Sequence, residues 1–82
     1  MEVVTTEDVG SVMLFTVKVS ETEMQAYESC IFYLLKHLSD AEIEKVTGHT
    51  REELEPVHDD VLSAIQQHCD RQYLPKRYGQ QI

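Results

Sequence analysis

Residues 39–62 of the chain read SDAEIEKVTGHTREELEPVHDDVL. Ser39–Glu42 has the pattern of a capping box, in which the serine side chain accepts a hydrogen bond from the amide three residues later and the glutamate bonds back. Thr50–Glu53 repeats the pattern, and Gly48 between the two boxes suits the left-handed conformation that ends a helix. The segment therefore predicts a short helix over 40–47 and a longer helix that opens at the second box. The inward-facing residues of the short helix are predicted to be Ala41, Ile43 and Val46.

The spacing of this segment resembles a helix-turn-helix, the motif that many DNA-binding regulators place in the major groove. Leu54 follows the glycine by six residues, where a hydrophobic side chain packs the second helix onto the first. Two features depart from the motif. Glu44 occupies a position that is small in the motif, and Lys45 and Arg51 are the only bases among eight acids: Asp40, Glu42, Glu44, Glu52, Glu53, Glu55, Asp59 and Asp60. Because affinity for DNA depends on basic side chains that displace counterions, this charge argues against nucleic acid as a partner.

Pro56 leaves two arrangements open for the last helix. If the helix starts at Arg51, the proline is its sixth residue, removes a hydrogen bond to Glu52 and bends the axis. If residues 51–54 form a separate turn, Pro56 opens a new helix, a position that suits proline. In both arrangements the inward-facing residues are predicted to be Leu54, Val57, Val61, Leu62, Ile65 and Cys69.

A third capping box, Ser20–Glu23, predicts the start of a helix that runs to about residue 38. Apolar residues with helical spacing form its inward stripe: Met24, Tyr27, Ile31, Leu34 and Leu38. Apolar residues also fill 30–35, well beyond one face, so this central helix is predicted to be buried on more than one side. Phe32 and Tyr33 in this stretch are predicted to take part in self-association.

The N-terminal residues predict a β-hairpin, because 2–6 and 12–20 suit strands and the residues between them are typical of a turn. One face of the second strand is wholly apolar and is predicted to pack on the helices: Met13, Phe15, Val17 and Val19. Val12 and Leu14 lie on the other face. A two-stranded hairpin is marginally stable alone, and its free edge accepts another strand. We therefore predict a homodimer whose self-association surface includes Val12, Leu14, Phe32 and Tyr33.

These segments predict a single α+β domain over 1–70, with a hairpin followed by three helices, and a basic tail over 71–82. A second chain is one way to complete the small sheet. The 82 residues carry a net charge of −8, which favours basic partners over nucleic acid and anionic lipid. No apolar run approaches the length of a membrane span and the first residues lack the pattern of a signal peptide, so a cytoplasmic location is expected.

No residue pattern predicts a catalytic or metal site. The four histidines form no HxxxH pair: His37, His49, His58 and His68. Cys30 lies in the most apolar stretch, where burial makes a thiol inert, and the neighbours of Cys69 point in different directions on a helix. The two thiols are expected to be free, with a disulfide between helices as the alternative. We expect no catalytic residue, no metal ligand and no cofactor.

The expected function is therefore docking and not chemistry. The chain is predicted to be a small acidic protein-binding or regulatory module, and a basic, nucleic-acid-handling protein is one candidate partner. Two alternatives remain open: a helix-turn-helix-like DNA-binding regulator, and a small phage or mobile-element inhibitor that imitates nucleic acid. The partner-binding surface is predicted to be an acidic face made of Glu42, Glu52, Glu53, Glu55 and Asp59.

Overall fold

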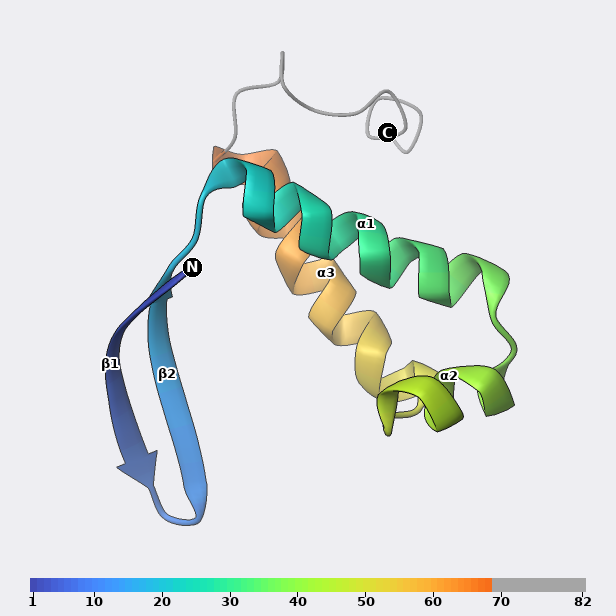
Figure 1. The fold of residues 1–82 in the computed structure, drawn as a ribbon, viewed down its shortest axis with the longest axis horizontal. Helices are drawn as coiled ribbons and strands as arrows, with labels where there is room; N and C mark the ends of the chain where they lie inside the picture. Colours follow the sequence, from blue (N-terminus) through green and yellow to red (C-terminus); the bar gives the residue numbers. More distant parts are fainter. Residues whose placement is uncertain (69–82) are drawn as a thin grey trace.

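The computed structural model describes residues 1–68, and its elements confirm the predicted α+β fold. A two-stranded antiparallel hairpin comes first and three helices follow (Figure 1). Cys69 and the predicted basic tail over 71–82 lie outside the described residues. The elements in chain order are β1 (Glu2–Val9), β2 (Val12–Lys18), α1 (Glu21–His37), α2 (Asp40–Thr47) and α3 (Arg51–His68).

The hairpin turns more tightly than the sequence predicted. β1 continues to Val9, which pairs with Val12, so only Gly10 and Ser11 form the loop. Gly10 has a φ of 65°, a conformation that glycine adopts without the steric cost of a Cβ. Two-residue loops with glycine in the first position match the twist of paired strands, which explains why the strands extend so far. A register shift near the start of β1 marks a β-bulge.

All three predicted helix starts are confirmed, and each is closed by a capping box. The side-chain oxygen of the capping residue accepts a hydrogen bond from the amide three residues later, at 3.0 to 3.2 Å. The glutamate carboxylate in turn accepts a hydrogen bond from the amide of the capping residue. These bonds satisfy amides that have no partner within the first helical turn. The three boxes are Ser20 with Glu23, Ser39 with Glu42 and Thr50 with Glu53.

α3 is one continuous helix, so the first of the two arrangements predicted for Pro56 is the one present. The proline is the sixth residue of the helix and has no N–H to donate to the carbonyl of Glu52. Gly48 ends α2 in the left-handed conformation, with a φ of 76°, as predicted. His49 and Thr50 complete a short turn into α3.

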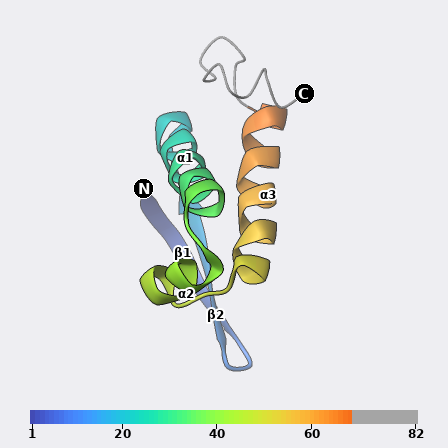
Figure 2. The same cartoon turned by 90° about the vertical axis from the view of Figure 1, so that its right-hand side faces the viewer.

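α1 and α3 lie side by side, and α2 lies across one end of the pair (Figure 2). Ile43 and Ile65 are the only buried hydrophobic residues among residues 1–68. The prediction that Val46 and Val57 face inward is wrong, since they are 67% and 47% exposed, and Ala41 is exposed as well. The physical reason is that three short helices enclose little volume, and no further layer covers the outer sides of α2 and α3.

The hairpin projects away from the helices and does not pack on them (Figure 1). Every residue of β1 and β2 is exposed. The predicted packing of Met13, Phe15 and Val17 on the helices is therefore wrong: these residues are 48%, 62% and 40% exposed. The reason is the short connection, because only Val19 and Ser20 join β2 to α1 and Ser20 holds the extended conformation of a helix cap. Val19 alone of the predicted face is half-buried.

Candidate functional site

The residues of the predicted acidic face lie at the surface of α2 and α3. Every one of them is exposed: Glu42, Glu52, Glu53, Glu55 and Asp59. Along α3, the spacing of Glu52, Glu55 and Asp59 is three residues and then four, so these carboxylates share one side of the helix. His58 and Ile65 are buried on another side. α3 therefore shows a row of carboxylates to solvent and packs through its other side.

Glu42 and Glu53 also have a structural role. The carboxylate of Glu42 accepts a hydrogen bond from the amide of Ser39 at 3.0 Å, and this bond lowers the pKa of Glu42 below its ordinary value. The carboxylate of Glu53 accepts a hydrogen bond from the amide of Thr50 at 2.8 Å, which lowers the pKa of Glu53 in the same way. Both side chains stay ionised to a lower pH than a free glutamate, and each helps to start a helix.

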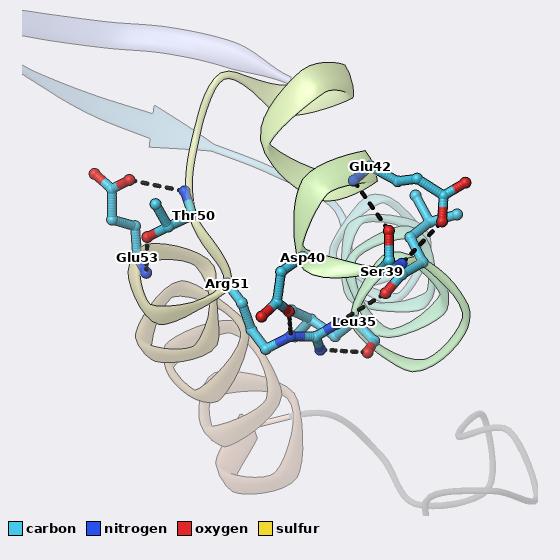
Figure 3. Close-up of polar contacts among 8 residues, drawn as sticks. Leu35, Ser39, Asp40, Glu42, Thr50, Arg51 and Glu53 are labelled. Carbon is cyan, nitrogen blue, oxygen red and sulfur yellow. Dashed lines mark hydrogen bonds and ion pairs between the residues drawn. The ribbon is translucent and has the colours of Figure 1, made fainter.

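Arg51 joins the three helices through its guanidinium group (Figure 3). Its Nε donates to Oδ1 of Asp40 at 2.6 Å, its Nη1 to the carbonyl oxygen of Leu35 at 2.5 Å, and its Nη2 to the carbonyl oxygen of Leu38 at 2.8 Å. These carbonyls lie at the end of α1, where a helix leaves carbonyl groups without helical partners, and Asp40 opens α2. The planar fork of arginine can satisfy several acceptors at once.

The role of Arg51 was not predicted from the sequence. A signal was present, because a base in the first turn of a helix opposes the helix dipole and is unfavourable there without another partner. Arg51 is bound to Asp40 and to the end of α1, so Lys45 is the one other Lys or Arg side chain of segment 40–60 that could bind a phosphate. A short turn after Gly48 joins α2 to α3, and the first turn of α3 places Glu52 and Glu53 at the surface, where their charges repel phosphate.

A buried contact between Glu28 and His58 joins α1 to α3, and sequence reasoning missed it. His58 Nε2 lies 2.5 Å from Glu28 Oε2, and the two residues are 8% and 0% exposed. This contact is a hydrogen bond, and it links the packed sides of α1 and α3 directly. The sequence signal is position: Glu28 follows Met24 by four residues and precedes Ile31 by three, and His58 follows Leu54 by four. Both are polar residues within apolar helical stripes.

The surroundings of this pair show which side of α1 faces α3. The ring of Phe32 lies 6.1 Å from the ring of His58, measured between centroids. One turn before Glu28, the side-chain nitrogen of Gln25 is buried and has no hydrogen-bond partner among the described residues. The inward side of α1 is therefore centred on Glu28, whereas Tyr27, predicted to lie in the inward stripe, is 39% exposed.

The four residues predicted for self-association lie in two separate places. Val12 and Leu14 are 54% and 47% exposed on β2. Tyr33 is exposed on α1 with its ring centroid 4.4 Å from that of His37, whereas Phe32 is half-buried. Because the hairpin points away from α1 (Figure 1), these residues do not form one continuous surface on a single chain.

The remaining candidates for chemistry gain no support from geometry. Cys30 is exposed on α1, so its predicted burial is wrong. Within residues 1–68, no three His, Cys, Asp or Glu side chains gather as they would around a metal ion. No helix of that part of the chain is long and apolar enough to cross a membrane. The function must be inferred from the surfaces of the protein itself, since no protein-family model, no curated protein and no solved structure matches the chain.

Proposed function

We propose that the protein is a non-catalytic docking module that presents its acidic face to a basic surface of a protein partner. The acidic face consists of Glu42, Glu52, Glu53, Glu55 and Asp59, all exposed. One observation carries the proposal: Arg51, one of the two bases of segment 40–60, directs its guanidinium group to Asp40 and to the end of α1. Arg51 and Asp40 therefore offset each other's charge, and seven exposed acids of segment 40–60 remain against Lys45 alone.

Hydrogen bonds fix the position of the helical turn at which the row of Glu52, Glu55 and Asp59 begins. The row begins in the first turn of α3, which the Thr50–Glu53 capping box closes and which Arg51 fastens to α1. Complementary charge steers two proteins together and fixes their orientation more than it adds affinity. A fixed row of carboxylates matches a partner that presents a row of Lys or Arg side chains.

A nucleic-acid-handling protein offers this kind of surface, because its groove is lined with Lys and Arg side chains that bind phosphates. In that case the acidic face occupies the groove in place of a phosphate backbone. The DNA-binding alternative needs the same α3 helix to approach phosphates, and its surface acids oppose that approach.

The test compares two double variants that change the net charge equally. Glu52→Gln with Glu55→Gln removes two charges from the acidic face while leaving the capping residues in place. The matched control, Glu2→Gln with Glu7→Gln, removes two exposed charges from β1. Each protein is used to capture partners from nuclease-treated lysate, and the captured protein is then purified and its binding measured by calorimetry at two salt concentrations.

We expect the Glu52 and Glu55 variant to bind its partner at least tenfold more weakly, and the control to bind as the unmodified protein does. Raising the salt concentration should weaken binding, because exposed charges are screened. Equal binding by both double variants would contradict the proposal. Recovery of nucleic acid, with proteins retained only through it, would contradict it as well and favour the DNA-binding alternative.

A further inference from the structure

The hairpin exposes apolar side chains on both of its faces. Their exposed fractions run from 40% to 62%, for Val3, Val4, Val9, Val12, Met13, Leu14, Phe15 and Val17. A half-exposed residue of this size leaves roughly 80 Å² uncovered, so the four on the face of Phe15 (Val3, Met13, Phe15 and Val17) show on the order of 300 Å² together, which is within the range of the largest patch on a typical monomer. An isolated hairpin of two strands is also marginally stable in water. Both facts indicate that the hairpin has a partner.

The two edges of the hairpin differ in charge. β1 carries three acids, Glu2, Glu7 and Asp8, all exposed. β2 has the sequence VMLFTVK, with no acid, no proline, no glycine and Lys18 at its very end. Proteins protect exposed edge strands with charges, prolines or bulges. By these criteria the β1 edge is protected, by its acids and by its bulge, and the β2 edge is open to another strand.

We propose that the occupant of the β2 edge is a second copy of this chain, paired strand to strand in the antiparallel sense. The result is a four-stranded sheet in the order β1, β2, β2 of the second copy, β1 of the second copy. A pairing centred on Phe15 places the two Phe15 side chains opposite each other. Met13 then faces Val17 of the second copy, and Lys18 at one end faces Val12 at the other.

The charges and side chains of β2 fit this pairing. In the β2–β2 pairing no acid lies opposite another acid. Pairing through β1 would instead bring Glu2 of each copy close to Glu7 and Asp8 of the other. Apolar and aromatic side chains opposite each other are favourable cross-strand pairs, and the central pair is aromatic on both sides. Four strands exceed the three that a sheet needs for independent stability. The inference concerns the hairpin alone and stands apart from the acidic face.

The test uses Phe15, which faces itself in the proposed dimer. Phe15→Lys and Phe15→Glu each place like charges opposite each other, and a mixture of the two variants places opposite charges there. The matched control is Thr6→Lys, because Thr6 is the partner of Phe15 within the hairpin but belongs to the β1 strand. Mass in solution is measured by light scattering over a dilution series, and helix content by circular dichroism.

We expect the unmodified chain and Thr6→Lys to have twice the chain mass of 9.5 kDa, and each Phe15 variant to have the mass of one chain. The mixture of Phe15→Lys and Phe15→Glu should return to the doubled mass. Helix content should not change, because no residue of β2 is buried against the helices. The proposal is overturned if the unmodified chain is monomeric, if Phe15→Lys stays dimeric, or if the mixture fails to recover the dimer.

Discussion

The buried contact between Glu28 and His58 gives the sharpest prediction about stability. We expect His58→Ala to lower the free energy of unfolding by about 1–3 kcal/mol, the range observed when a buried hydrogen-bonding group loses a partner. The structural basis is that Glu28 is 0% exposed and lies 2.5 Å from the ring nitrogen that the substitution deletes. A domain of 82 residues has roughly 4–12 kcal/mol of stability in total. The variant should therefore lose a large share of the stability of the fold.

The chain contains a matched control made of the same residue types. His49 and Glu53 lie 4.0 Å apart with both side chains about 60% exposed. His49→Ala should cost no more than about 0.5 kcal/mol, since exposed pairs are screened by water. Urea titrations followed by circular dichroism, at one fixed protein concentration because association shifts apparent stability, give both values.

A double variant separates the contact from the space that it fills. Glu28→Met with His58→Leu replaces both partners by apolar side chains of similar size and should recover most of the lost stability. If His58→Ala costs no more than His49→Ala, the buried contact does not stabilise the fold and the reasoning is wrong. If the double variant is as unstable as His58→Ala, packing of the ring and not its contact with Glu28 accounts for the loss.

Three further predictions concern the helix starts and the hydrogen bonds of Arg51. Arg51→Lys should lower stability by about 1–2 kcal/mol, because lysine cannot bond three separate acceptors, whereas Lys45→Arg should change little in the same urea titration. Ser39→Ala should cost about 1 kcal/mol through loss of the helix cap, and Ser39→Asp, which can still cap, should restore most of it. The pKa values of Glu42 and Glu53 are lowered in the folded protein, so their contribution is complete above the ordinary pKa of 4.5 and is lost as the pH falls below it. Helix content measured during acid titration should therefore decrease below that pH, and a profile that stays flat down to strongly acidic pH would contradict the capping role.

The sequence predicted the element order and the three helix starts because these depend on local chemistry. A capping box is decided by two residues three positions apart, and Ser20, Ser39 and Thr50 each begin one. The direction of the hairpin depends instead on the backbone of the link, where the capping box determines the conformation of Ser20 and no side-chain pattern determines that of Val19. The apolar face formed by Met13, Phe15 and Val17 would suit packing against a helix of the same chain and would equally suit packing against a second protein chain.

The candidate site shows the same division. The exposure of the acidic residues follows from their helical spacing, so that part was predictable. The internal bonds of Arg51 and the buried contact of Glu28 depend on which turn of α1 meets α3, and that is a property of packing. The sequence shows each of them only as an unusual position: Arg51 is a basic residue in the first turn of a helix, and Glu28 is a carboxylate within an apolar stripe.

The two-residue link between β2 and α1 leaves the hairpin little freedom to move relative to α1. Val19 and Ser20 are the whole covalent connection, and Ser20 is fixed by hydrogen bonds with Glu23 at the first turn of α1. The ammonium group of Met1, just before β1, also contacts the carboxylate of Glu23, at 2.6 Å. A load applied to a paired hairpin is therefore transmitted directly into α1 and is not absorbed by a loop. One residue inserted into that first turn would rotate the hairpin by about 100° around the helix axis, so the length of this joint determines where the open strand edge points.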